Sequence, residues 1–125
     1  KPASPRDARE MLERLSGKTH QVYTGFCLVQ QRGSRCIADT VQTDVVFKTL
    51  SATEIDWYIH TGEPFDKAGA YAIQGLGTFL VRRINGSYTN VVGLPVCEVV
   101  EILLRERVMG LEVRPGEQHI SQEQL

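Results

Sequence analysis

Apolar residues in the segment 5–15 recur at the spacing of one helix face. They stand at i, i+3, i+4 and i+7, which predicts an amphipathic helix. Ser4 is expected to cap the N-terminus of this helix, and Pro5 suits its first position. Gly17 follows where a C-terminal cap belongs. The apolar face consists of Ala8, Met11, Leu12 and Leu15.

Two stretches of alternating apolar and polar residues follow and predict a long antiparallel hairpin. The first runs from His20 to Gln30 and the second from Arg35 to Lys48. The polar, glycine-containing run 31–34 between them is typical of a turn. Because the opposite face is polar, we expect the ribbon to be partly exposed. Its apolar face consists of Val22, Phe26, Leu28, Ile37, Val41, Val45 and Phe47.

Helical and glycine-rich segments make up the rest of the pattern. Ser51 and Glu54 form a capping box, which predicts the start of a second helix. The segment 62–77 carries four glycines and few strand signals, so we expect a loop, on which binding residues tend to lie. A strand is predicted for 78–84 and a third helix for 96–104. Together these elements predict an α/β or α+β domain with a mainly antiparallel ribbon.

Composition and length are those of one compact globular domain. The 125 residues are 42% hydrophobic and 23% charged, which provides a small core. We expect the folded part to span 1–109 and the polar segment 110–125 to be a loosely ordered tail. The net charge of -1 and the pI near 6.3 argue against a nucleic-acid partner. No apolar run approaches the roughly 18 residues of a membrane span or resembles a signal peptide, so we expect a cytoplasmic protein without a membrane partner.

The cysteines and histidines show no pattern of a disulfide framework or a metal site. Cys27, Cys36 and Cys97 are odd in number, widely spaced and form no CxxC pair. We therefore expect three reduced, mostly buried thiols, as in a cytosolic protein. The three histidines lack metal-ligand spacing, and nucleophilic catalysis has no sequence signal either.

Asp66, Lys67 and Gln74 are the candidate binding residues of the glycine-rich segment. A lysine neutralises phosphate charge, and an aspartate can hold a metal ion or orient that lysine. Gln74 presents a donor and an acceptor, as a nucleobase edge does. The same residues would also suit an exposed loop with a solvated ion pair. Lys1 is a further cation, for which a solvated terminal position is the simplest interpretation.

Three blocks of the sequence resemble, in the same order, those of the Maf family of nucleoside triphosphate pyrophosphatases. The first, from Lys1, is KPASPRDAREMLERLSGKTHQVYTG, and the second, from Leu50, is LSATEIDWYIHTGEPFDKAGAYAIQG. The third, from Ile84, is INGSYTNVVGLP. The similarity extends from Lys1 to about the end of the third predicted helix. Dispersed blocks in a constant order are more specific than any single motif.

The resemblance implies a two-lobed α/β fold of the Maf/ITPase-like kind, with an elongated mixed sheet, a long antiparallel hairpin and flanking helices. It implies hydrolysis of a nucleoside triphosphate between its α- and β-phosphates, with a divalent metal cation, Mg or Mn, as cofactor. By the same resemblance, Lys1 lies near the substrate phosphates, and Asp66 and Lys67 belong to the DKAG loop at the cleft. Gln74 is implied to determine base preference, and a glutamine in place of a glutamate points to dTTP and UTP.

Two motifs of the family lie upstream of its KP motif, where this sequence begins. They are the SPRR loop and an ADT segment whose aspartate is the expected general base, so no catalytic residue is assigned here. We interpret the look-alike sequences Ala3–Arg6 and Ala38–Thr40, which includes Asp39, as coincidence, because they fall at the wrong places in the block order. Hydrolysis needs a positioned water and a base, so we expect the 125 residues alone to be inactive or very weakly active.

Three functions stay open at this point. The first is a pyrophosphatase acting on dTTP and UTP, which Gln74 and the pair of Asp66 and Lys67 favour. The second is a non-catalytic protein-interaction module linked to septum formation. The third is a regulator that binds dTTP without hydrolysing it. A homodimer is an expectation of the family, which no residue pattern in the sequence shows.

Overall fold

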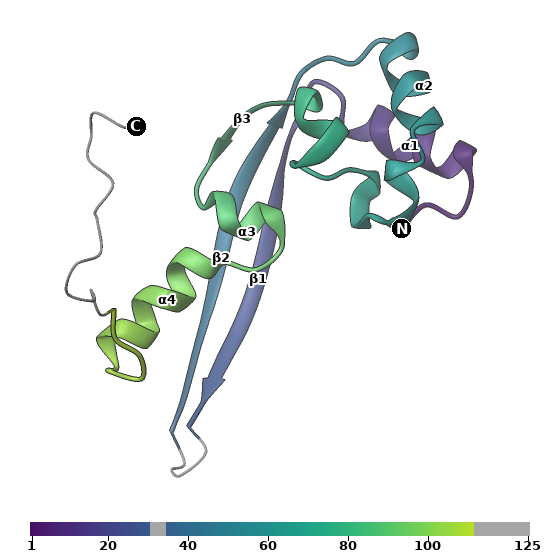
Figure 1. Ribbon diagram of the computed structural model, residues 1–125. Helices are drawn as coiled ribbons and strands as arrows, with labels where there is room; N and C mark the ends of the chain where they lie inside the picture. The colour runs from purple at the N-terminus through teal and green to yellow at the C-terminus, as the bar shows by residue number, and fades with distance from the viewer. Residues whose placement is uncertain (31–34, 112–125) are drawn as a thin grey trace, which may run out of the picture.

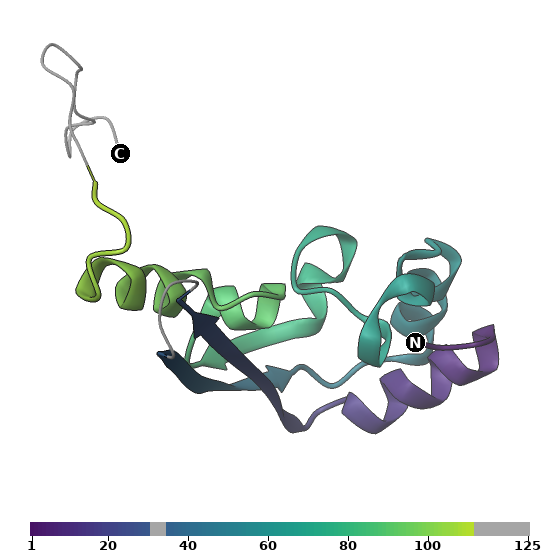
Figure 2. The same cartoon turned by 90° about the horizontal axis from the view of Figure 1, so that it is seen from below.

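A three-stranded antiparallel sheet runs through the computed structural model (Figure 1). The structure describes residues 1–30 and 35–111, so the predicted turn at 31–34 and nearly all of the predicted tail lie outside the described residues. Helices α1 and α2 gather at one end of the sheet, whereas α3 and α4 lie along one of its faces (Figures 1 and 2). The elements are α1 (Pro5–Leu15), β1 (Thr19–Val29), β2 (Cys36–Phe47), α2 (Ala52–His60), the 3-10 helices η1 (Glu63–Asp66), η2 (Ala68–Ala70) and η3 (Gly75–Leu80), β3 (Val81–Asn85), α3 (Tyr88–Val92) and α4 (Val96–Arg105).

Helix α1 begins and ends where its sequence predicts. The Ser4 hydroxyl accepts a hydrogen bond from the backbone N–H of Asp7 at 3.1 Å, and Pro5 occupies the first turn. Gly17 has a positive φ of 68° just beyond the helix, and its N–H donates to the carbonyl of Lys48. This bond places the helical end of the molecule against the end of β2.

Strands β1 and β2 pair antiparallel, from Thr19 opposite Val46 to Val29 opposite Cys36. Burial alternates along β1 as the apolar pattern predicts. In β2, fully buried positions are concentrated toward Phe47, at the end near α1 and α2. Strand β3 adds to β2 and is also antiparallel, so the sheet of the described residues is antiparallel throughout. The mixed sheet implied by the family resemblance is therefore not seen in 1–30 and 35–111.

The expectation of three reduced, mostly buried thiols is wrong. Cys27 and Cys36 are joined by a disulfide, and Cys97 on α4 is exposed. Cys27 lies opposite Ala38 and Cys36 opposite Val29, so the two cysteines are diagonal neighbours on one exposed face. Their Cα atoms are 6.5 Å apart, a separation that a disulfide spans. Sequence spacing does not show this proximity, because it depends on the register of the strands.

The strand predicted after the glycine-rich segment is shorter than expected and begins only at Val81. The residues before it belong to η3, where the Thr78 hydroxyl donates to the carbonyl oxygens of Ile73 and Gly75. Side-chain bonds of this kind hold the backbone in a turn and compete with strand pairing. The short helix α3, whose N-terminus is capped by Ser87, is not predicted by the apolar pattern.

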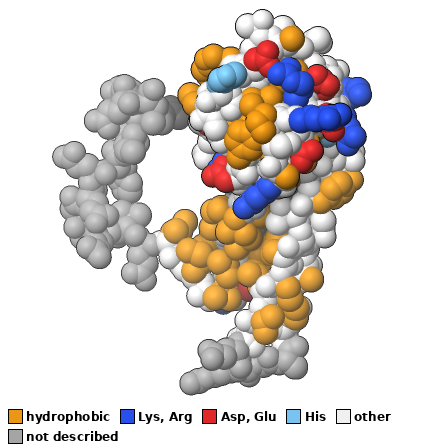
Figure 3. Space-filling view, turned by 90° about the vertical axis from the view of Figure 1, so that its right-hand side faces the viewer, with side chains coloured by type: hydrophobic (Ala, Val, Ile, Leu, Met, Phe, Trp, Pro, Cys, Tyr) orange, Lys and Arg blue, Asp and Glu red, His pale blue; other side chains and the backbone are white. Residues whose placement is uncertain are grey.

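The buried core lies where α1, α2 and the 3-10 helices meet the sheet. It consists of Ala8, Leu12, Val45, Phe47, Leu50, Ile55, Tyr58, Ile59, Ala70 and Leu80. Figure 3 shows charged side chains gathered over this end of the molecule, above a largely apolar region. No helix within the described ranges is long and apolar enough to cross a bilayer. The core supports the 3-10 helices from beneath, and these carry the candidate binding residues.

Candidate functional site

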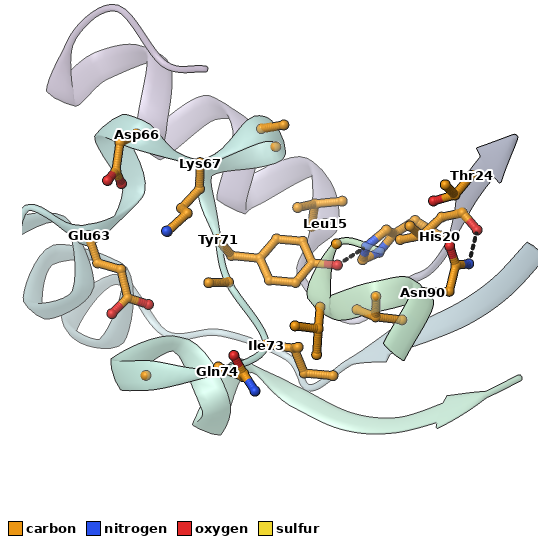
Figure 4. Close-up of a pocket in the computed structure, with 18 of the residues that line it drawn as sticks. Leu15, His20, Thr24, Glu63, Asp66, Lys67, Tyr71, Ile73, Gln74 and Asn90 are labelled. Carbon is orange, nitrogen blue, oxygen red and sulfur yellow. Dashed lines mark hydrogen bonds between the residues drawn. The ribbon is translucent and has the colours of Figure 1, made fainter. Parts of the chain in front are cut away.

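A cavity of about 970 Å³ lies between β1, the 3-10 helices and α3 (Figure 4). Asp66, Lys67 and Gln74 all line this cavity, so the structure brings together three of the four residues that the resemblance implicates. Lys1 is exposed and is not among the residues that line the cavity. Asp39, from the ADT look-alike, is an exposed residue of β2 beside a different, shallower hollow.

Lys67 is the cation of the cavity wall. Its backbone N–H donates to the carbonyl of Pro64 at the end of η1, and Figure 4 shows its side chain extending between Glu63 and Tyr71. Among the described residues, its ammonium makes no ion pair and no side-chain hydrogen bond, and the neighbouring Asp66 does not pair with it. An unpaired ammonium in a cavity wall is available to an anionic ligand such as a phosphate.

Gln74 enters the cavity from an extended stretch of backbone immediately before η3. The next residue, Gly75, has a φ of 81°, a left-handed conformation that favours glycine. The Gln74 side chain is exposed, and its amide nitrogen lies 3.5 Å from the hydroxyl oxygen of Tyr88. The amide can therefore present both a donor and an acceptor to a ligand.

Glu63 is a further residue of the cavity, and the sequence patterns do not single it out. Its carboxylate accepts hydrogen bonds from the Tyr58 hydroxyl and from the backbone N–H groups of Leu76 and Gly77. Burial alone would raise the pKa of Glu63, but these bonds and the nearby Lys67 ammonium lower it below its ordinary value. Glu63 is therefore ionised at neutral pH. In the sequence, the turn residues Gly62 and Pro64 on either side of Glu63, just before the DKAG motif, were the feature that could have drawn attention to it.

The rings of His20 and Tyr71 line the cavity, and Phe47 is buried beside them without lining it. His20, Phe47 and Tyr71 pack edge to face, with ring centroids 4.7 to 5.4 Å apart. The Tyr71 hydroxyl lies 2.6 Å from Nε2 of His20. Burial raises the pKa of Tyr71 to about 12 and lowers the pKa of His20, so both side chains are neutral at pH 7. A neutral aromatic wall suits the flat face of a nucleobase or the apolar face of a sugar.

Asn90 closes the cavity on the side of α3. It is 1% exposed, and its amide nitrogen donates to the carbonyl oxygens of Val22 and Val41 and to the hydroxyl of Thr43, at 3.0 to 3.2 Å. These bonds pin α3 across β1 and β2. A lone asparagine in a polar stretch of sequence has no pattern that reveals such a role, because its partners are 47 to 68 residues away.

Of the residues that line the cavity, Asp66 is the one best suited to act as a metal ligand. Within the described residues, no group of three or more acidic, histidine or cysteine side chains could hold an ion unaided. The carboxylate of Glu63 is engaged by three donors, whereas Asp66 is exposed and its side chain makes no hydrogen bond or ion pair in 1–30 and 35–111. Magnesium is commonly held by one or two carboxylates together with phosphate oxygens. Asp66 therefore offers a single ligand, and a cation bound here would need its other ligands from outside the described residues.

Comparisons with known proteins identify a matching family and several relatives. The family model described as Maf-like protein matches residues 1–106. A dTTP/UTP pyrophosphatase of Syntrophus aciditrophicus (strain SB) is 51% identical over 119 residues, which cover 95% of this chain and 57% of the relative. Proteins of the same name from Syntrophotalea carbinolica and Myxococcus xanthus are 54% and 51% identical over 105 residues, 84% of this chain. The chain spans about half the length of the curated relatives it matches.

Proposed function

This chain belongs to the Maf-like protein family, and we propose that it forms the substrate-binding wall of a nucleoside triphosphate pyrophosphatase acting on dTTP and UTP. The products would be the nucleoside monophosphate and pyrophosphate. The observation that carries this proposal is the convergence of Asp66, Lys67 and Gln74 on one cavity. The relatives are named dTTP/UTP pyrophosphatases, which supports an enzyme over an interaction module.

Each of the three residues has a distinct part in the proposed complex. The ammonium of Lys67 neutralises charge on the phosphates, where a preorganised cation is most effective. The amide of Gln74 pairs with a carbonyl and the N3–H of thymine or uracil, since it offers one donor and one acceptor. Tyr71 and the aromatic wall beside it contact the apolar surface between these two ends of the substrate.

A divalent cation, Mg or Mn, belongs to this proposal as a cofactor. Asp66 would hold it together with the triphosphate, and when bound it would neutralise phosphate charge and polarise the phosphoryl group. Activation of the attacking water is assigned to none of the 125 residues, so the proposal for this chain concerns binding and base recognition. We also propose that the whole fold contains the elongated mixed sheet implied by the family resemblance, and that the antiparallel sheet described above is part of it.

Titration of the ¹⁵N-labelled chain with dTTP, followed by NMR, tests the phosphate-binding part. We expect the amide signals of Lys67 and Gly69 to shift, and Lys67→Ala to weaken binding at least about tenfold, or ~1.4 kcal/mol. Lys18→Ala is the matched control, because Lys18 is an exposed lysine that does not line the cavity. If Lys67→Ala binds dTTP as tightly as the wild type, the DKAG segment is only a solvated surface loop.

Replacement of Gln74 tests base recognition separately. A glutamate at this position accepts hydrogen bonds but cannot donate one to a pyrimidine carbonyl. We expect Gln74→Glu to lower the preference for dTTP over dGTP, measured as the ratio of their dissociation constants, because the added charge acts equally on the triphosphate that both ligands share. An unchanged preference would remove Gln74 from the specificity assignment and leave the phosphate site standing.

A further inference from the structure

The Glu63 carboxylate fastens η1 to the first turn of η3. Its Oε1 accepts hydrogen bonds from the Tyr58 hydroxyl at 2.8 Å and from the N–H of Gly77 at 3.0 Å. Its Oε2 accepts from the N–H of Leu76 at 3.0 Å. Hydrogen bonds to an ionised acceptor are stronger than those between neutral groups. The backbone that follows Gln74 is therefore held by one side chain from another segment.

The backbone of η3 approaches this carboxylate more closely than a side chain would allow. A Cβ at Gly75 would lie 2.9 Å from Oε2 of Glu63, and a Cβ at Gly77 would lie 2.6 Å from the Tyr58 hydroxyl oxygen. Contacts under about 3.0 Å are not made by real Cβ atoms. The two glycines thus allow the loop to pack directly on Glu63 and Tyr58.

The other end of the same loop is held by Tyr58. Its side chain is fully buried, and its hydroxyl accepts a hydrogen bond from the N–H of Ala72 at 3.3 Å. Glu63 and Tyr58 therefore hold the chain on both sides of Gln74, at Ala72 and at Gly77. The Gln74 side chain itself is exposed. Among the described residues, its only hydrogen-bond partner is the hydroxyl of Tyr88, which is also exposed. Its position consequently depends on the backbone that carries it.

We propose that Glu63 is a positioning residue, which sets the placement of the Gln74 amide and thereby the selectivity among nucleobases. This inference rests on the proposed function, in which Gln74 contacts the base. Thymine and cytosine share the pyrimidine ring but exchange donor and acceptor at N3 and C4, so an amide held in one orientation distinguishes them. A displaced amide loses that distinction, while Lys67 still holds the phosphates.

The ratio of the dissociation constants of dTTP and dCTP, measured by NMR titration, tests the proposal. In Glu63→Gln, an NH₂ group replaces one of the two accepting oxygens and opposes a backbone N–H. We expect this variant to lower the selectivity for dTTP about tenfold without weakening the binding of inorganic tripolyphosphate, since the substitution removes one negative charge from the cavity. Glu54→Gln is the matched control, because Glu54 also accepts from a backbone N–H and from a side chain, Lys48, but does not line the cavity.

A double variant separates positioning from a general loss of structure. If Glu63 acts through Gln74, Glu63→Gln combined with Gln74→Ala will show the same selectivity as Gln74→Ala alone. Should Glu63→Gln fail to fold, Tyr58→Phe, which removes one of the three donors to the carboxylate, is expected to lower the selectivity about threefold.

The outcomes distinguish this inference from the proposed function. If Gln74→Ala lowers the selectivity and Glu63→Gln does not, the positioning role is refuted and base recognition by Gln74 stands. Additive effects of the two substitutions would also refute it, because Glu63 would then act on the base by another route. If the wild type binds dTTP and dCTP equally, or binds neither, the proposed function fails and the inference fails with it.

Discussion

Replacing Tyr58 by phenylalanine removes one buried hydroxyl and leaves the ring in the core. Tyr58 is fully buried, its hydroxyl donates to Glu63, and it accepts from the N–H of Ala72. Burial and the Glu63 carboxylate raise the pKa of this hydroxyl well above its ordinary value, so it is protonated and donates throughout the neutral range. In the variant, Glu63 loses one donor and the Ala72 N–H loses its acceptor.

The expected cost follows from these two losses. A hydrogen bond to a charged group contributes about 1.5–3 kcal/mol, and the Ala72 bond is long and weaker. We therefore expect the free energy of unfolding to fall by about 2–3 kcal/mol. For a domain of this size, such a loss lowers the melting temperature by about 10 °C. In urea, with a slope of roughly 1.5 kcal/mol per M, it lowers the midpoint by about 1.3–2 M.

Urea unfolding followed by the fluorescence of Trp57, the single tryptophan, measures this change next to Tyr58. Tyr23→Phe is the matched control. The Tyr23 hydroxyl also donates to a side-chain oxygen, Oε1 of Gln21, but Tyr23 is exposed. Its cost should stay within about 0.5 kcal/mol. Equal midpoints for the two variants would refute the view that the Tyr58 hydroxyl and Glu63 hold the loop around Gln74.

Two further predictions concern titration and thiols. The pKa of His20 is lowered by burial, so the folded state binds its proton less readily than the unfolded state, and the free energy of unfolding should decrease as the pH falls below about 6.5. His20→Gln should flatten this dependence in urea titrations between about pH 7.5 and 5.5; a slope unaffected by His20→Gln would contradict a partly buried, neutral histidine. In protein purified without reductant and then unfolded, thiol titration should detect Cys97 alone, and reduction should raise the count to all three cysteines of the sequence. Three thiols before reduction would show that the hairpin disulfide is absent.

Local elements of this fold are predictable from short stretches of sequence. Ser4 caps α1, and Ser51 with Glu54 forms the capping box of α2, because these bonds join residues only three positions apart. The alternation of β1 predicts which face is buried for the same reason, since successive side chains point to opposite sides of a strand. Errors arise where a side chain bonds to the backbone of a nearby residue, as the Thr78 hydroxyl does to the carbonyl of Gly75 before β3.

The candidate binding residues were partly predictable, and by a different route. Asp66, Lys67 and Gln74 lie within nine positions of one another and match a family block, so the sequence indicated them together. Their meeting in one cavity with the aromatic wall of His20 and Tyr71 depends on the packing of η1 to η3 against β1. The residue pattern alone favoured a solvated Lys1 and only the family resemblance grouped it with these residues; the structure leaves Lys1 exposed and outside the cavity lining.

Three features were decided only by the tertiary structure. The disulfide requires the strand register that sets Cys27 diagonal to Cys36. The anchoring of α3 by Asn90 requires both β1 and β2. The support of the Gln74 loop requires the Glu63 carboxylate to accept from backbone N–H groups 13 and 14 residues further along the chain. In each case the partners are set by how separate elements pack. Helix caps and strand alternation are determined by neighbouring residues. The caps are hydrogen bonds between residues a few positions apart, and the alternation follows from successive residues of one strand. Register and loop support come from contacts between segments far apart in the sequence, so neighbouring residues do not determine them.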